Sequence, residues 1–461
     1  MAFIRKIKKN NSVYLAEVEN YRENGKVKQR VIRYIGKEIE GRAVKRITSD
    51  SIQINSVKEY LDYKVLDDIA DRLQIKELLG KSSKHILMLV YIQLIKRKPI
   101  YQLPEYIEHT TLKEILGLEK LVDKDFYKAL DNFDELDFSE IEDKIFKTLS
   151  SISSIEANKK ALVLDVTDTY FNGIDADWKL RKGKDGKYSK LIQIALAVTK
   201  EDGFPIFHKI YEGNISNVKI FKDVIADIRL KEFDVVLLDR GMLSYESIKD
   251  LKHLNQKVIA GIKKNENIKR DFLSKINREE IYHPSCCVKL KNTRVFVKPF
   301  DFEQGQLIII YNPELEITKR EHAMQDLKNY DIEKAKYMGY SLIYHTTDMD
   351  VEEVVKRYFE RDIVEKAYKE LKSNINLHPI RKYRMNHIKS HIKICYIAYA
   401  ILSYMQYRLK PKSISAVKAL EQLQAVYKIY LESIKDNFKW DKIVTLTNEQ
   451  KKILELLECS V

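Results

Sequence analysis

Apolar and polar residues alternate along the amino-terminal part of the chain, and the period becomes helical further on. Strands are predicted near 2–8, 13–21 and 27–35, and Asn24-Gly25 suits a tight hairpin turn between the last two. From Leu61 the apolar residues recur every three to four positions. The preceding Ser56-Val57-Lys58-Glu59 has the form of a helix capping box.

Apolar runs alternate with amphipathic segments in the middle of the chain, which predicts an α/β fold. The predicted strands are 160–171, 190–199, 205–212, 233–239 and 257–262, and the predicted helices are 217–229 and 243–254. Three further β-like runs, CCVKLKN, TRVFVKPF and QLIIIYN, predict an insertion before the core resumes.

The predicted organisation has six parts. They are a small basic antiparallel β module (1–45), an all-helical domain (46–155), a first core segment (160–264), a β-rich insertion (265–345), a second core segment (346–410) and a helical carboxy-terminal region (411–461).

Three acidic residues stand out against this pattern. Asp165 lies in the run ALVLDVTDTYF, Asp239 ends the run FDVVLLD, and Glu365 lies in a predicted helix over 358–372. Carboxylates from two strand ends and a helix can converge on one point, as binding of two Mg²⁺ ions for phosphoryl transfer requires. Asp168 competes with Asp165, but strand alternation puts Thr167 rather than Asp168 on the face of Asp165.

The predicted helix places polar residues on one face. Tyr358, Arg361, Glu365 and Lys372 fall within about 60° of each other over about 21 Å, and Lys369 joins them. Cationic side chains beside an acid suit a metal-bound phosphate. The alternative is a solvated helix with ordinary Arg361–Glu365 and Glu365–Lys369 ion pairs.

The spacing of these four residues, Y-x2-R-x3-E-x6-K, resembles the signature of DDE transposases of prokaryotic insertion sequences, in insertion-sequence family four. Other blocks are similar too. They are Asp165-Val166-Thr167, Gly213-Asn214 with Ser216, Asp239-Arg240-Gly241, and NGKVKQRVIRYIGK (24–37), which resembles the opening of one subgroup.

The resemblance implies a ribonuclease H-like catalytic core, in which adjacent first and fourth strands bring Asp165 near Asp239. It implies that Asp165, Asp239 and Glu365 are catalytic and hold two Mg²⁺ ions, with Mn²⁺ able to substitute. One ion would activate water or a 3′-hydroxyl and the other would stabilise the leaving oxygen.

The partners implied are double-stranded transposon-end and target DNA, bound by a homodimer that excises and inserts the element. The predicted DNA-binding residues are Tyr358, Arg361, Lys369, Lys372, Arg381 and Arg384.

One departure concerns the insertion, which in hairpin-forming relatives supplies a tryptophan that supports a flipped base. The only tryptophans here, Trp178 and Trp440, lie outside it. Phe296, Phe300 and Phe302 fit base stacking and a sheet core equally well. The hairpin step therefore has no assigned residue.

Composition agrees with a nucleic-acid partner. Lys and Arg total 82 against 68 Asp and Glu, a formal charge of +14, which favours a polyanion. The apolar stretches 86–95 and 394–405 are too short to span a bilayer, so no membrane is expected. Four cysteines without a paired spacing fit a reducing cytoplasm, and DNA as partner suggests association with the nucleoid.

Alternative interpretations remain at this stage. His283 with Cys286 and Cys287, and His387 with His391, have metal-like spacings but lack further ligands. The helical domain suits recognition of transposon ends or dimer packing. The whole chain could be a catalytically silent DNA-binding regulator derived from a transposase, or a ribonuclease H-like nuclease without strand transfer.

Overall fold

The computed structural model describes residues 2–9, 12–23, 25–39, 42–44, 52–153, 161–171, 180–182, 188–213, 215–249, 256–291, 293–325, 330–375, 377, 380, 384–434 and 438–460. These residues form two compact units. One contains Met1–Glu59 and Val426–Thr445, and the other contains Tyr60–Ala425 and Leu446–Val461. The boundaries of the six predicted segments stay predictions.

The strands are β1 (Ala2–Lys9), β2 (Ser12–Glu23), β3 (Lys26–Ile39), β4 (Arg42–Val44), β5 (Ile52–Glu59), β6 (Ala161–Phe171), β7 (Leu180–Lys182), β8 (Tyr188–Thr199), β9 (Pro205–Glu212), β10 (Val235–Leu243), β11 (Lys257–Ile262), β12 (Cys287–Lys289), β13 (Arg294–Phe302), β14 (Gly305–Tyr311), β15 (Tyr340–His345), β16 (Tyr427–Ser433) and β17 (Phe438–Ile443).

The α-helices are α1 (Leu61–Arg72), α2 (Ile75–Leu79), α3 (Ser83–Ile95), α4 (Leu103–Ile107), α5 (Leu112–Leu116), α6 (Asp123–Asp134), α7 (Phe138–Ile152), α8 (Asn217–Ile225), α9 (Tyr245–Ile248), α10 (Glu266–Asp271), α11 (Arg278–Ile281), α12 (Pro313–Met324), α13 (Ile332–Ala335), α14 (Val351–Phe359), α15 (Asp362–Lys369), α16 (Met385–Leu409), α17 (Ala416–Leu423) and α18 (Asn448–Leu457).

The amino-terminal strands β1 to β4 form an antiparallel sheet. Gly25 has φ +77 at the turn between β2 and β3, a conformation that glycine adopts without steric cost. Cross-strand ion pairs such as Arg33–Glu17 (2.8 Å) cover part of its surface.

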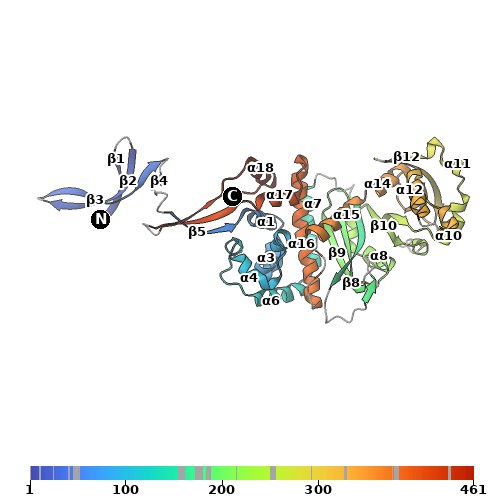
Figure 1. Ribbon diagram of the computed structural model, residues 1–461, viewed down its shortest axis with the longest axis horizontal. Helices are drawn as coiled ribbons and strands as arrows, with labels where there is room; N and C mark the ends of the chain where they lie inside the picture. The colour runs from blue at the N-terminus through green and yellow to red at the C-terminus, as the bar shows by residue number, and fades with distance from the viewer. Residues whose placement is uncertain are drawn as a thin grey trace. The chain divides into compact units, whose positions relative to one another are not determined.

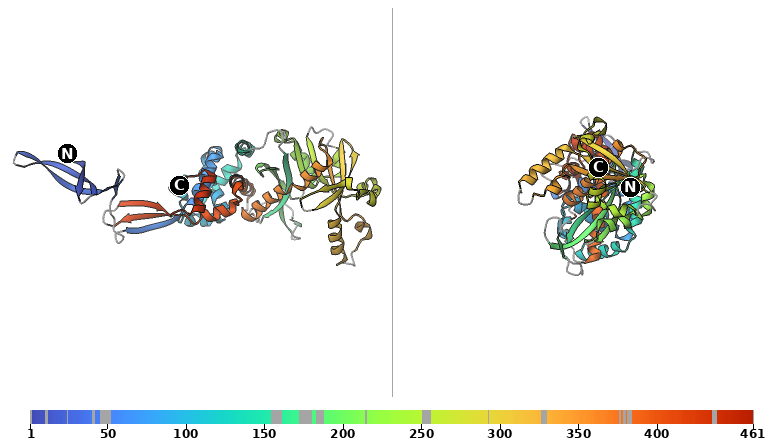
Figure 2. Two further views of the ribbon diagram at one scale, coloured as in Figure 1. Left: turned by 90° about the horizontal axis from the view of Figure 1, so that it is seen from above. Right: turned by 90° about the vertical axis from the view of Figure 1, so that its right-hand side faces the viewer.

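A second small sheet, in the order β17-β16-β5, corrects two predictions. Ser56 to Glu59 belongs to strand β5 and is not a helix cap, and the carboxy-terminal region is not wholly helical because it contains β16 and β17. Figure 2 shows blue β5 beside the two red strands. The pairing joins segments more than 360 residues apart, so a short local pattern could not reveal it.

The helices of the second unit gather around α16, which is mostly buried. It contacts α3 and α6 on one side and strand β9 on another, so it stands between the helical part and the large sheet (Figure 1). The predicted core helix over 394–405 is the central part of α16. Within the described residues, no helix is long and apolar enough to cross a bilayer.

The large mixed sheet has ten strands in the described part of the chain, in the order β12-β13-β14-β15-β11-β10-β6-β8-β7, with β9 paired to β8. The predicted adjacency of the first and fourth core strands is confirmed, because β6 and β10 pair in parallel. Their apolar residues Leu162, Leu164, Val236 and Leu238 lie in the main hydrophobic core, which holds this centre of the sheet in place.

The predicted insertion contains strands β12 to β15. Its strands continue the large sheet through β15, which pairs antiparallel with β11. It also contains α12, which the sequence pattern did not predict, although Asn312 caps this helix and Pro313 occupies its first turn. The predicted helix over 243–254 is observed as α9, and residues 250–255 lie outside the described part.

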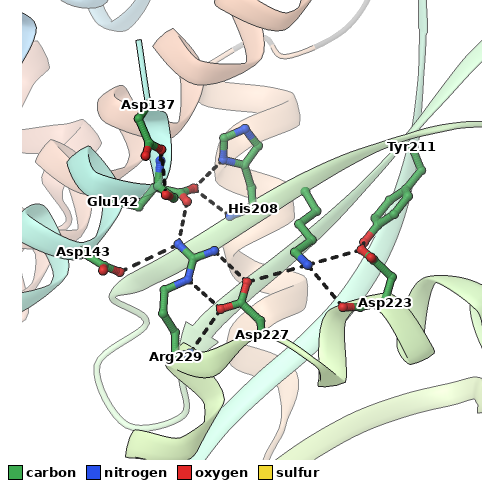
Figure 3. Close-up of polar contacts among 10 residues, drawn as sticks. Asp137, Glu142, Asp143, His208, Tyr211, Asp223, Asp227 and Arg229 are labelled. Carbon is green, nitrogen blue, oxygen red and sulfur yellow. Dashed lines mark hydrogen bonds and ion pairs between the residues drawn. The ribbon is translucent and has the colours of Figure 1, made fainter.

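A buried polar network fastens helix α7 to the large sheet (Figure 3). Glu142 accepts hydrogen bonds from the His208 backbone N–H (2.8 Å) and from Arg229 Nη1 (2.8 Å), and it lies 2.6 Å from His208 Nδ1. Arg229 also forms two bonds to Asp227 (2.8 and 2.9 Å). Burial opposes ionisation of Asp227, but Arg229 holds the pKa of that carboxyl below its ordinary value.

Candidate active site

The two aspartates follow directly from the pairing of β6 and β10. The parallel register runs from Ala161–Val235 to Leu164–Leu238, and Asp165 and Asp239 are the next residues on the two strands. Equivalent residues of neighbouring parallel strands point to the same side, about 4.8 Å apart. The register therefore supports Asp165 as the partner of Asp239, in preference to Asp168.

The predicted helix over 358–372 is broken. α14 ends at Phe359, a turn occupies Glu360 and Arg361, and α15 begins at Asp362 and continues into a π-helical turn. Tyr358 and Glu365 thus lie on different helices, and the prediction of one continuous helix face is wrong here. Tertiary contacts decide the break, since α14 packs on β11 whereas α15 packs on β6 and β8.

Arg361 bridges the two helices and the sheet. Its Nη2 donates to Asp239 Oδ1 (2.6 Å), and its guanidinium lies 4.0 Å from the ring centroid of Tyr358. Burial lowers the pKa of Arg361, but Tyr358, Asp239 and Glu365 outweigh it and raise this pKa above its ordinary value. Arg361 therefore stays charged and pairs with Asp239 in this structure.

Tyr358 is buried beneath Arg361 with only 7% of its surface exposed. A Cβ added to Gly261 would lie 2.0 Å from the Tyr358 hydroxyl, so β11 needs glycine at this contact. Burial raises the pKa of Tyr358, and the negative charges of Asp239 and Glu365 add to the rise while Arg361 opposes it.

Tyr368 and Lys372 anchor the following segment to β6. The Tyr368 hydroxyl lies 2.7 Å from the Asp165 carbonyl oxygen and 2.9 Å from that of Ile194. Lys372 Nζ donates to the hydroxyl of Thr167. Burial, with the nearby charge of Asp165, raises the pKa of Tyr368 well above its ordinary value, so this residue is a neutral donor. Sequence analysis missed Tyr368, although its position three residues after Glu365 puts it on the same side of the helix.

Glu365 is exposed on α15 between these two anchors. Arg361, four residues before it, reaches Asp239, and Tyr368, three residues after it, reaches Asp165. Within the described residues, no three His, Cys, Asp or Glu side chains stand close enough to hold a metal ion as placed. Arg361 and Tyr368 thus connect the segment around Glu365 to both aspartate positions.

Two of the three remaining predicted DNA-binding residues lie in the described part of the chain. Lys369 and Arg384 are exposed, whereas Arg381 lies outside the described residues. In the same basic stretch, Lys393 is buried and its Nζ lies 3.0 Å from the Asp134 carbonyl oxygen, so it holds α16 to α6. His387 pairs with Asp131 at 2.8 Å, which accounts for this histidine without a metal.

The G-N-x-S block has structural roles where it is described. A Cβ added to Gly213 would lie 2.3 Å from the Leu191 Cβ, so only glycine fits beside β8. The Ser216 side chain caps α8 by accepting from the Lys219 N–H. Asn214 lies outside the described residues.

The three phenylalanines of β13 pack with other aromatic residues. Phe302 stacks on Tyr245 with ring centroids 5.1 Å apart, Phe300 packs edge-on against Phe272, and Phe296 lies 4.8 Å from Tyr282. These contacts agree with the interpretation as a sheet core.

Comparison with known proteins identifies the family of the chain. A family model described as "Transposase DDE domain" matches residues 156–401, and one described as "IS1634 family transposase, N-terminal domain" matches residues 4–51. No curated protein matches the chain. A solved structure, the piggyBac transposase synaptic complex with hairpin DNA, has 12% sequence identity and a TM-score of 0.43 over 79% of this chain and 76% of that one. Since the transposase domain model spans more than half of its length, the chain belongs to the family of DDE-domain transposases.

Proposed function

We propose that Asp165, Asp239 and Glu365 are the catalytic triad of this DNA transposase. The observation that carries the proposal is the register of β6 and β10, which ends at Leu164–Leu238 and is followed by an aspartate on each strand. Arg361 and Tyr368 connect α15 to β10 and β6, which supports including Glu365 in the same site. This arrangement supports a ribonuclease H-like core.

The family implies dependence on a divalent metal ion, and the carboxylate donors of this site fit that requirement. We propose two Mg²⁺ ions held by Asp165, Asp239 and Glu365, with Mn²⁺ able to substitute. When bound, such ions activate a hydroxyl nucleophile and stabilise the leaving oxygen of a phosphodiester.

The surrounding residues orient the acids and the DNA. Tyr368 sets the position of Glu365 relative to β6, and Tyr358 supports the guanidinium of Arg361. Because Arg361 is already bound to Asp239, it must exchange this carboxylate for a DNA phosphate when the site becomes active. Exposed Lys369 and Arg384 would neutralise nearby phosphates.

The proposed reaction is excision of the element at its ends followed by joining to target DNA, carried out by a homodimer on double-stranded DNA at the nucleoid. The test supplies a pre-cut end with a free 3′-hydroxyl and a target plasmid. Joined products support a transposase, hydrolysis alone would indicate a nuclease, and binding without cleavage would indicate a silent regulator.

Arg361→Ala should separate metal binding from DNA processing. Freeing Asp239 from its ion pair should raise Mn²⁺ affinity about tenfold, since hydrogen bonds between charged groups contribute about 1.5–3 kcal/mol. Cleavage should fall because a phosphate partner is lost. Electron paramagnetic resonance would measure free Mn²⁺ in titrations of both proteins without DNA.

The matched control is Arg357→Ala, which removes a surface pair with Glu353 on α14. Unchanged Mn²⁺ affinity in Arg361→Ala would show that the Arg361–Asp239 pair does not compete with metal.

We further propose that recognition of transposon ends resides in the amino-terminal β module and the helical segment. In the described part of the chain, β1 to β4 pair only with each other, so removal of residues 1–44 leaves β5 and its sheet intact. The truncated protein should lose most of the preference for end over scrambled duplex, typically about 10³-fold for specific binding. Competition binding would measure it, and an undiminished preference would exclude the β module from recognition of the transposon ends.

A further inference from the structure

A group of cationic side chains lies beside Asp239, contributed by three segments. Arg240 follows Asp239 on β10, Lys263 and Lys264 follow β11, and Lys319 lies on α12 of the insertion. A Cβ added to Gly261 would lie 3.2 Å from the Arg240 Cβ, and one added to Gly241 would lie 2.7 Å from the Lys263 Cε. Arg240 and Lys263 therefore lie at the adjoining ends of β10 and β11, and Lys264 follows Lys263 directly.

These residues lack acidic partners. Over the residues that the structure describes, no ion pair involves Arg240, Lys263, Lys264 or Lys319. Lys264 Nζ instead donates to the carbonyl oxygens of Tyr337 (2.7 Å) and Tyr340 (3.2 Å), which hold it at the edge of the insertion. Lys264 is therefore held in position by carbonyl oxygens, without a carboxylate partner among the described residues.

Burial and neighbouring cations disfavour the charged forms of Lys264 and Lys319. Burial lowers the pKa of Lys264 to about 8, and repulsion from Lys319, Arg240 and Lys269 adds to the effect. Burial and repulsion from Arg240 also lower the pKa of Lys319. Half-buried like charges destabilise the fold unless an anion joins them. The cluster therefore has the chemistry of an anion site.

We propose that Arg240, Lys264 and Lys319 bind DNA backbone phosphates next to the scissile bond. Asp239 precedes Arg240 directly, so a strand that reaches the acids passes this cluster. The position of the cluster next to the scissile bond rests on the proposed triad. Binding of phosphate by the cluster does not depend on the triad. The insertion thereby supplies charge to the DNA path through α12.

The first test measures binding of the full-length protein to a duplex carrying the inverted repeat that flanks the gene, in EDTA so that no cleavage occurs. Arg240→Gln and Lys319→Gln should each reduce the slope of log affinity against log salt by about one, and the double variant by about two. The control is Lys336→Gln, an exposed lysine paired with Glu333, which should leave the slope unchanged. The proposal would be overturned if Arg240→Gln and Lys319→Gln both gave the same salt slope as Lys336→Gln.

The second test needs no substitution of half-buried Lys264. Reductive methylation of the wild-type protein, read by mass spectrometry, should show protection of Lys264 and Lys319 by the same duplex but no protection of Lys336. Equal modification of all three lysines with and without DNA would also overturn the proposal. If Asp239→Asn kept its cleavage activity, the proposed triad would be rejected but the phosphate site would not. Neither binding measurement depends on catalysis.

Discussion

Asp165→Asn, Asp239→Asn and Glu365→Gln are each expected to abolish DNA cleavage and strand joining. Each substitution keeps the size of the side chain but removes a negative ligand. A metal ion supplies several kcal/mol of charge stabilisation to a phosphoryl transfer, so the rate should fall about 10³-fold or more. The measurement is the appearance of cut and joined products from end duplex and target plasmid in Mg²⁺.

Controls on the same elements separate this effect from misfolding. Asp168→Asn changes another acid of β6, and Asp362→Asn changes an acid of α15 that pairs with Lys366 at the surface. Both variants should keep cleavage within a few-fold. End binding in EDTA should persist in all five variants. Substantial cleavage by Glu365→Gln would remove this residue from the triad.

Glu142→Ala is expected to cause the largest loss of stability. Glu142 is 2% exposed, and its removal leaves His208 without its acceptor and Arg229 without one of its three carboxylate partners, the others being Asp227 and the more distant Asp143. Removing one partner of a buried ion pair typically costs about 3–5 kcal/mol, because the remaining charge stays desolvated. Urea unfolding followed by circular dichroism would measure the shift of the midpoint of the second unit.

The control lies on the same helix. Glu140 pairs with Lys144 at the surface of α7, so Glu140→Ala should change stability by no more than about 0.5 kcal/mol. Equal midpoints for Glu142→Ala and Glu140→Ala would show that the network in Figure 3 does not hold α7 to the sheet.

The parts that the amino-acid sequence predicted correctly depend on local period and spacing. The runs around Asp165 and Asp239 are apolar over several consecutive residues, which is typical of buried central strands, and both form the middle of the large sheet. The turn at Gly25 follows from the backbone freedom of glycine. The Y-x2-R-x3-E-x6-K spacing identified the transposase family, because a signature is carried by residue order alone.

Pairing between distant segments could not be predicted in this way. β5 has its partner in β16, and the insertion joins the large sheet through β15 and β11. A strand pattern shows which side chains are buried, but the hydrogen-bonding edge of any strand accepts many partners. Only packing of the whole chain selects among them.

Tertiary contacts also decided the arrangement of the proposed active site. The helical pattern over 358–372 continues through Glu360 and Arg361, yet the chain turns there because α14 packs on β11 and α15 packs on β6. The hydrogen bond from Arg361 to Asp239 and the cation cluster beside it join residues far apart in the chain. The sequence determined which residues carry charge, whereas the tertiary structure decided which charges meet, because Coulomb interactions depend on separation in space.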